Sequence, residues 1–499
     1  MTPPPGPPPG AAPVPAEGSV RFGTPVGRWV VAATVLGSGI AFLDGTVVNV
    51  ALPTMGHDLH AGIRGLQWIL DGYLVTLSAL LLLGGSLGDL YGRKRGFLAG
   101  LVGFSVASTV CGFAPDTGVL VAARAMQGAG AALLVPGSLA LISASFHPDD
   151  RGRAIGAWSG LAGVAGAIGP FVGGWLIDAV SWRLIFFINL PIAAVCFVIT
   201  SRFVPESMDM AERGVRPDFA GALTASLGLA AMAYGLIERQ VGAGVIGALL
   251  IVGFVLIERR VAHPMLPLAV FRSSQFTGAN LTTLAVYTGL GGTTFALVLQ
   301  LQKSLGYSAL EAGSSLFPLT VLMLLLSSRS GALAQRIGPR VQMTVGPMIV
   351  ALGLLLLTRA QPGQSYLSGV FPGAMVFGLG LVITVAPLTT AVLAAVDDHH
   401  VGVGSAFNNA VSRIAGLLAV AALPLFATLD TASPVRTFDR GYRHAMVICA
   451  AICALGGAIS WLTIRRSRPV TNVPQASVFQ SCNDPCLAQG SAAPDRDAA

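Results

Sequence analysis

The chain has 499 residues, of which 53% are hydrophobic and only 11% charged, and its mean hydropathy is +0.72. Water-soluble domains of ordinary size cannot bury so many apolar side chains, so most of the chain must face lipid. The basic residues behind the net charge of +7 are scattered between long apolar runs, which excludes the gathered basic surface of a nucleic-acid-binding protein. Four of the six cysteines lie within apolar runs, so no disulfide framework is predicted.

The first half of the chain contains a proline-rich start and six long apolar runs. Residues 1–27 lack the apolar core of a signal peptide and are predicted to form a disordered tail. A helix that crosses a bilayer needs about 20 apolar residues, and each of the six runs is close to that length. They predict an N-terminal six-helix bundle over residues 28–204, with spans that begin near Trp29, Leu66, Gly96, Gly118, Ala154 and Arg183.

Eight more apolar runs follow. Two of them, joined by a very short turn, predict a pair of inserted transmembrane helices, and the last six predict a C-terminal six-helix bundle with spans that begin near Gln275, Ala312, Val341, Gly369, Val403 and Ala445. In chain order, a linker covers residues 205–217, the inserted helices cover 218–260, a second linker covers 261–274, the second bundle covers 275–465 and a disordered tail covers 466–499. The predicted fold is therefore an all-α integral membrane protein with fourteen transmembrane helices.

The charges in the loops predict the orientation of these helices. Lys and Arg close to the ends of spans prefer the cytoplasmic side. Most of them fall in cytoplasmic loops if the N-terminus is cytoplasmic, with the exception of Arg436, Arg440 and Arg443 in the last external loop. Because the number of spans is even, both termini are then predicted to be cytoplasmic.

Matching glycines suggest that the two bundles are repeats. Residues 85–95 close the second span and residues 331–340 close the tenth, and their glycines and a leucine correspond at a constant offset. At a similar offset, Gly152 and Gly166 correspond to Gly402 and Gly416. Paired halves around a site at the middle of the membrane are a common design of alternating-access transporters.

Four motifs lie on these predicted helices. They are residues 43–53 (LDGTVVNVALP) in the first span, 84–95 (GGSLGDLYGRKR) after the second, 124–130 (RAMQGAG) in the fourth and 160–174 in the fifth. With them, residues 28–465 resemble the major facilitator superfamily and, within it, the fourteen-helix drug:proton antiporters. The resemblance implies two halves that alternate access to a central cavity.

The resemblance also implies a function. It predicts a monomeric proton-coupled efflux transporter of the bacterial cell membrane that exports drugs, antibiotics or other small lipophilic compounds, with the proton gradient as energy source and no cofactor. The alternatives are a transporter or facilitator of a specific metabolite and, from a different class, a non-transporting membrane receptor. The predicted partners are the small-molecule substrate, protons and the lipid bilayer, and no nucleic acid.

Asp44 is the main candidate for proton coupling. A carboxylate near the centre of a span costs about 2.5 to 3.5 kcal/mol to insert, so it is expected to have a use. Counted from the outer ends of their spans, Asp44 is about 12 Å and Arg124 about 9 Å deep, so the two could share one layer. Arg124 could then tune a proton carrier, or the two could form a permanent ion pair that locks two helices. Asp71, nearer the outer rim of the second span, is a further proton-coupling candidate.

The loop after the second span is a candidate conformational latch. Gly88 and Gly92 predict a tight turn, and Asp89 and Arg93 a charge-assisted pair, although an ordinary cytoplasmic loop would also account for the basic residues. The resemblance implies that Asp89 is attracted to the start of the thirteenth helix, near Gly402 to Gly404. The predicted latch residues are Gly85, Gly88, Asp89, Gly92, Arg93 and Arg95.

The fifth span carries a glycine pattern that resembles the signature of exporters. Its residues are Gly166, Gly169, Pro170, Gly173 and Gly174. Close helix packing alone would explain these glycines, and the proline predicts a kink. The exporter interpretation therefore comes from the resemblance.

Polar and aromatic residues in several spans are predicted to line the substrate cavity. For Trp68 the alternative is an interfacial anchor, and for Arg413 it is a hydrogen bond to a carbonyl of a neighbouring helix. The predicted cavity residues are Asn49, Trp68, Tyr73, Gln127, Trp158, Gln300, Phe407, Asn408 and Arg413.

Other kinds of chemistry have little support in the sequence. Lys94 and Lys303 are the only lysines and neither follows a glycine, so a Walker-type phosphate loop is excluded. Residues 397–400 (DDHH) are the one cluster that resembles metal ligands, and they are interpreted as a solvated loop with no metal site. Nothing resembles a hydrolase nucleophile with its base, so the chain is predicted not to be an enzyme.

Overall fold

The computed structural model describes residues 18, 20–207, 218–261, 264–396 and 401–464. Within these ranges the chain folds into helices, and fourteen spans are long and apolar enough to cross a membrane, which confirms the predicted fold class. The helices of the first half are α1 (Pro25–Asp58), α2 (Ile63–Tyr91), α3 (Arg93–Gly112), α4 (Thr117–Ser145), α5 (Pro148–Ala179), α6 (Leu184–Phe187) and α7 (Asn189–Phe203). The inserted pair is α8 (Phe219–Ile237) and α9 (Val241–Glu258). The second half contains the 3₁₀-helix η1 (Leu268–Arg272) and α10 (Ser274–Lys303), α11 (Ala309–Ser314), α12 (Phe317–Ile337), α13 (Pro339–Leu357), α14 (Tyr366–Gly369), α15 (Phe371–Leu393), α16 (Val401–Phe426) and α17 (Val435–Thr463).

Local sequence explains where several helices begin. The first N–H groups of a helix lack partners inside it, and a preceding Ser, Thr or Asp side chain can accept from them. Thr24 caps α1, Asp116 caps α4, and Ser308 forms a capping box with Glu311 at the start of α11. Pro318 stands in the first turn of α12, where a proline is tolerated, and the tenth span is accordingly split into α11 and α12.

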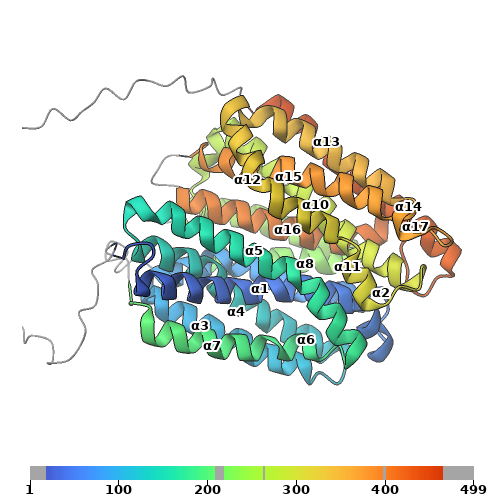
Figure 1. The fold of residues 1–499 in the computed structure, drawn as a ribbon, viewed down its shortest axis with the longest axis horizontal. Coiled ribbons are helices and arrows are strands. Elements are labelled where there is room, and N and C mark those ends of the chain that lie inside the picture. The colour runs from blue at the N-terminus through green and yellow to red at the C-terminus, as the bar shows by residue number, and fades with distance from the viewer. Residues whose placement is uncertain (1–17, 19, 208–217, 262–263, 397–400, 465–499) are drawn as a thin grey trace, which may run out of the picture.

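The helices form two bundles that lie side by side. Figure 1 shows α1 to α7 in one bundle and α10 to α17 in the other, with α1 beginning and α17 ending on the same side of the molecule. We call this side the inner end, and the side at which α1 ends and α2 begins the outer end. The charges in the loops predict that the inner end is cytoplasmic.

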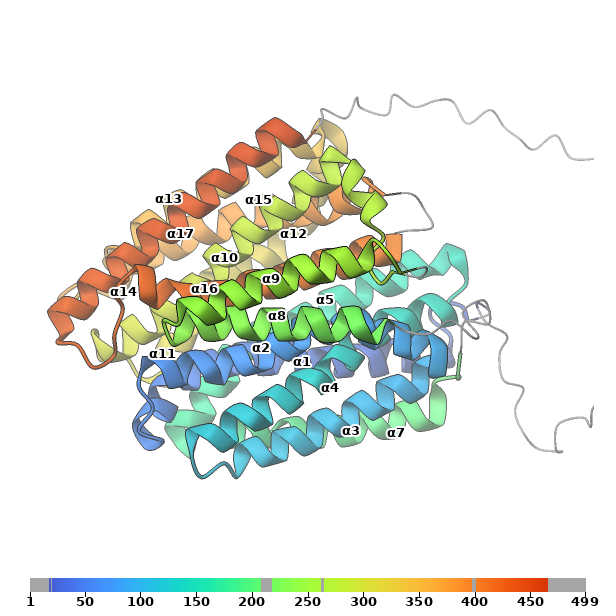
Figure 2. The same cartoon turned by 180° about the vertical axis from the view of Figure 1, so that it is seen from behind.

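The inserted helices lie over the seam between the bundles. Figure 2 shows α8 and α9 between the two halves, and α8 contacts both α2 and α16. At the outer end of this pair, Glu238 accepts a hydrogen bond from Trp68 Nε1 at 3.0 Å and forms an ion pair with Arg64 at 3.1 Å. Val245 and Leu249 of α9 are more than half exposed, as side chains that face lipid would be.

The structure corrects two predicted boundaries. The helix α17 begins at Val435, so the basic cluster predicted in the last external loop, Arg436, Arg440 and Arg443, lies in its first turns. Buried Asp439 accepts hydrogen bonds from Gln300 of α10 and from Ser304, which follows that helix, and this polar contact holds α17 beyond its apolar run.

The second correction concerns the tight turn predicted from Gly88 and Gly92. Only Gly92 has a left-handed backbone, with φ of 111°. Gly88 lies within α2, which continues to Tyr91, and a Cβ on Gly96 of α3 would stand 3.2 Å from the Gly88 Cα. Gly96 therefore permits the close approach of α2 and α3, whereas a Cβ on Gly88 would meet nothing within 4 Å, and Gly88 does not form the turn.

Candidate functional site

Asp44 and Arg124 are in direct contact. Arg124 Nη1 donates to Asp44 Oδ2 at 2.5 Å, and both side chains are almost completely buried. Gln127 Nε2 donates to the other carboxylate oxygen at 2.9 Å, while Arg124 also donates to Gln127 Oε1 and to the carbonyl of Ile69. In this conformation the pair therefore has the closed geometry of the predicted ion pair.

Two residues that sequence reasoning missed complete this network. Asn189, the first residue of α7, donates to Asp44 Oδ1 at 3.3 Å and to Ser108 Oγ of α3 at 3.1 Å. Gln127 also reaches Ser108, at 3.3 Å. Four helices of the first half thus contribute to one buried polar cluster, which fixes their relative rotation.

Asp71 is buried without a partner among the described residues. Its side chain in α2 is 0% exposed, and no described residue donates a hydrogen bond to either carboxylate oxygen. Burial of an ionised carboxylate without a donor is costly, and the neutral acid avoids most of this cost. Its surroundings therefore differ sharply from those of Asp44, whose oxygens accept three hydrogen bonds.

A small cavity of about 70 Å³ lies at the seam beside this cluster. Its walls come from α1, α2 and α4 of the first half and from α10 and α16 of the second, namely Gly45, Asn49, Leu70, Tyr73, Leu74, Arg124, Gly291, Thr294, Gly416 and Val420. Ligand cavities usually measure about 300 to 1,000 Å³, so the seam is nearly closed at this depth. Of the predicted cavity residues, Asn49 and Tyr73 line it.

The two halves are joined by polar contacts towards the outer end. Gln302 of α10 donates to the Val50 carbonyl of α1 at 2.9 Å, and Gln67 of α2 donates to the Val420 carbonyl of α16 at 2.7 Å. Asp178, at the end of α5, accepts from the N–H groups of the first two residues of α11, at 3.1 and 2.9 Å.

The glycines of the fifth span pack α5 against both halves. A Cβ on Gly173 would stand 2.8 Å from Val47 of α1, and one on Gly169 would collide with Thr46. On Gly174 it would stand 2.6 Å from the Leu310 Cα of α11, in the other half. Close packing is thus visible at these positions, and Gly174 belongs to the outer contact between the bundles.

The predicted latch is partly visible. Arg93 Nε and Asp89 Oδ1 are 2.6 Å apart, as the spacing predicts. Glu206, which sequence reasoning missed, accepts from the Lys94 backbone N–H at 3.0 Å and lies 3.7 Å from Arg95 Nε. The predicted approach of Asp89 to the start of the thirteenth helix stays a prediction, because residues 397–400, with the DDHH cluster, lie outside the described residues.

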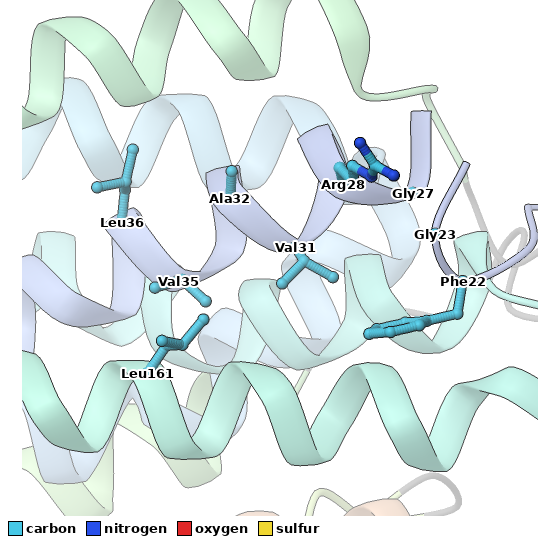
Figure 3. Close-up of a pocket in the computed structure, with 9 residues that line it drawn as sticks. All are labelled: Phe22, Gly23, Gly27, Arg28, Val31, Ala32, Val35, Leu36 and Leu161. Atoms are coloured by element: carbon cyan, nitrogen blue, oxygen red, sulfur yellow. The ribbon is translucent and has the colours of Figure 1, made fainter. Parts of the chain in front are cut away.

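A larger cavity of about 640 Å³ lies towards the inner end, between α1 and α5. Figure 3 shows Val31, Val35 and Leu161 between these two helices, with Phe22 at one end. Arg28 is the charged residue among its nine lining residues. The walls are apolar enough to accept a lipophilic molecule.

Three predicted cavity residues lie elsewhere, because side-chain direction depends on helix rotation. Trp68 is bonded to Glu238 of the inserted pair, as an anchor on α8. Gln300 is buried at the outer end of α10 and donates to Asp439. Phe407 packs against the rings of Phe271 and Phe276 near the inner end.

Asn408 and Trp158 have structural contacts of their own. Asn408 Nδ2 donates to Asn280 and to Thr283 at 2.7 Å, both within the second half, which accounts for its amide donors. Trp158 Nε1 donates to Ser38 Oγ at 3.1 Å across α1 and α5. Gln127, predicted as cavity wall, belongs instead to the Asp44 network.

Arg413 has none of these ties. Its guanidinium lies 5.3 Å above the ring of Phe42 of the opposite half, and its Nε is buried without an acceptor. The predicted bond to a carbonyl is not formed with any described residue.

Comparisons with known proteins agree with this architecture. A model of the Major Facilitator Superfamily matches residues 34–420. The chain is 34% identical over 490 residues to a puromycin resistance protein of Streptomyces alboniger, covering 93% of this chain and 97% of that protein. It is 34% identical over 472 residues to a probable actinorhodin transporter of Streptomyces coelicolor, covering 89% and 81% of the two chains.

Solved structures share the fold at low identity. A bacterial homologue of the human lysosomal transporter Spinster, in an inward-facing and unoccupied conformation, has a TM-score of 0.63 at 16% identity, covering 88% of this chain and 97% of that one. A D-xylose-proton symporter has a TM-score of 0.64 at 14% identity, covering 89% and 99%.

Proposed function

The chain belongs to the major facilitator superfamily, and from this premise we propose that it exports drug- or antibiotic-like small molecules in exchange for protons. It is a multi-pass membrane transporter, and its bacterial relatives place such proteins in the plasma membrane. What we propose is the class of the exported compound, the direction of transport and the coupling to protons. The exporter acts as a monomer by alternating access, with both termini in the cytoplasm.

The observation that carries proton coupling is the buried carboxyl group of Asp71. Its two oxygens have no donor in the part of the chain that the structure describes, so an exchangeable proton is the simplest group to stabilise it there. The contrast with Asp44 favours Asp71 as the principal proton carrier in this conformation, because Arg124 already neutralises Asp44. Asp44 becomes a second carrier if the ion pair opens during the cycle.

The contacts between the two halves support a transport cycle in which Asp71 carries the proton. With the outer contacts closed, the inner cavity between α1 and α5 admits the compound from the cytoplasm or the inner leaflet. Rocking of the two halves then opens the outer end, where Asp71 takes up a proton as the compound leaves. Return to the closed outer end carries that proton inward.

The test uses pH-driven efflux in proteoliposomes. A growth-inhibition panel in a pump-deficient bacterial host first identifies an exported compound. Asp71→Asn should then fold and still exchange this compound down its gradient, but lose uphill efflux under an imposed pH gradient, because the amide cannot carry a proton. Asp116→Asn is the matched control, since it changes an exposed helix cap that Asn serves equally well.

Asp44→Asn, measured in parallel, separates the two carboxyl groups. Loss of uphill efflux in Asp71→Asn alone supports Asp71 as the principal carrier, and loss in Asp44→Asn alone moves that role to Asp44. Unchanged uphill efflux in both variants would remove proton coupling through these residues.

A further inference from the structure

Arg413 is a cation near the middle of the membrane without a partner among the described residues. It lies about 18 Å from the inner end of α16, at 1.5 Å per residue. No described carboxylate pairs with it and no described acceptor bonds to it, although a guanidinium carries five N–H donors. Charged side chains at this depth are expensive and normally pair or face a cavity.

Arg413 lies on the face of α16 that is turned towards the pathway between the two halves. It lies on the stripe of α16 that also holds Gly416 and Val420, which line the small cavity at the seam. Its guanidinium faces Phe42 of α1, in the opposite half. It therefore stands between the two halves, next to the seam cavity and on its inner side.

Arg124, a fully buried cation at this level, is already neutralised. Arg124 pairs with Asp44 and is held by Gln127 as well, so it has little to offer an incoming anion. Arg413 has only the face of Phe42, and a cation–π contact uses none of its N–H donors. An acidic group that enters the seam thus finds one unpaired, donor-rich cation among the described residues.

We propose that Arg413 binds an acidic group, a carboxylate or an ionised phenol or enol, of the exported compound. The planar fork of a guanidinium matches such oxygens, and the Phe42 ring beside it provides an apolar surface for the rest of the molecule. The pump would then prefer acidic lipophilic compounds over neutral or cationic ones of the same shape. This inference rests on the proposed function, because it assigns the substrate class of the same pathway.

Binding to the purified protein tests the charge preference without any gradient. The probes are three pyrene derivatives with the same four-carbon chain, which ends in a carboxylate, a hydroxyl or an amine. The wild type should bind the carboxylate most tightly. Arg413→Gln should weaken carboxylate binding at least about tenfold and change binding of the alcohol less than about twofold, because it removes charge-assisted hydrogen bonds and little apolar surface. Arg413→Lys, a point charge without the fork, should lie between the two.

Arg359→Gln is the control, because Arg359 is exposed just after α13, lines neither cavity and gives the same change in net charge. It should leave the ratio of carboxylate to alcohol affinity unchanged. A wild type without preference for the carboxylate, an equal loss for carboxylate and alcohol in Arg413→Gln, or an equal effect of Arg359→Gln would each overturn the proposal. A preserved preference together with failure of pH-driven efflux in the wild type would instead overturn only the proposed function.

Discussion

The contrast between two buried aspartates governs the chemistry of the first half. Asp44 has a cation, two amides and a fixed position, whereas Asp71 has no donor among the described residues. A carboxyl group that exchanges a proton must exist in both the charged and the neutral state at modest cost. The two residues are therefore expected to differ in role, with Asp44 holding helices together and Asp71 titrating.

The ion pair predicts a specific loss of stability. Arg124→Gln leaves Asp44 buried without its cation, and removal of one partner from a buried pair costs about 3 to 5 kcal/mol. We expect a clearly lower thermal unfolding midpoint in detergent, and partial recovery when Asp44→Asn is added. Arg64→Gln, which removes the half-exposed partner of Glu238, should cost about 1 kcal/mol or less. Equal midpoints for Arg124→Gln and Arg64→Gln would contradict a stabilising role of the pair.

Sequence could predict the contact of Asp44 with Arg124 because charges in apolar runs are rare and must find each other. It could not predict Asn189 or Ser108, since a single uncharged polar residue in an apolar run carries no comparable signal. The lack of a partner for Asp71 was equally invisible, because it depends on what the neighbouring helices present. The charge of a side chain in an apolar run identifies the candidate residues, whereas their hydrogen-bond partners depend on how the helices pack.

At the scale of helices, α5 connects the two bundles. Its glycines let α1 approach on one face and α11 on the other, and its last turn places Asp178 on the start of α11. A carboxylate at a helix N-terminus satisfies unpaired N–H groups and the helix dipole together. The outer contact is therefore both tightly packed and polar, which suits a surface that must separate and close again.

Gly174→Ala should weaken this outer contact. The added Cβ would stand 2.6 Å from the Leu310 Cα, and backbone cannot move aside as a flexible side chain can. We expect a shift towards the conformation with an open outer end. A cysteine introduced at Thr294, in an otherwise cysteine-free chain, should then react faster with a membrane-impermeant thiol reagent added outside intact cells.

Gly163→Ala is the matched control on the same helix, because nothing lies within 4 Å of its added Cβ. Its labelling rate should equal that of the parent. The same rate for Gly174→Ala would show that this contact does not limit opening.

The sequence could predict where the helices lie along the chain, but not how each helix is rotated about its own axis. Lipid demands long apolar runs, and these mark all fourteen spans. The wall of the cavity depends on which face of each helix turns inward, so the sequence could not show that Trp68, Gln300 and Phe407 lie away from the seam cavity in this conformation. The start of α17 was misplaced for a related reason, because the contacts of Asp439 extend it past its apolar run.

For the whole molecule, the closed outer end and the inner cavity are the features that support the proposed direction of transport. The inserted pair α8 and α9 covers the seam and is tied to the first half through Glu238. Because α8 also contacts α16, the pair spans the surface along which the halves would move in the proposed cycle. Its position on that surface could not be predicted from two apolar runs alone.

The charge of the transported compound should set how the pump responds to the membrane potential. If one proton enters for each neutral molecule exported, one positive charge moves inward, worth about 2.3 kcal/mol per 100 mV, and each pH unit adds about 1.4 kcal/mol. An acid exported as its anion moves one negative charge outward, which is equivalent to a second positive charge moving inward. The steepest concentration gradient that the pump can maintain for the acid should therefore depend on the membrane potential twice as steeply as that for its methyl ester. Proteoliposomes with an imposed potassium diffusion potential at equal pH measure both slopes. Equal slopes would mean that the acid crosses in its neutral, protonated form, so its carboxylate would have to take up a proton and leave Arg413 before the compound moves.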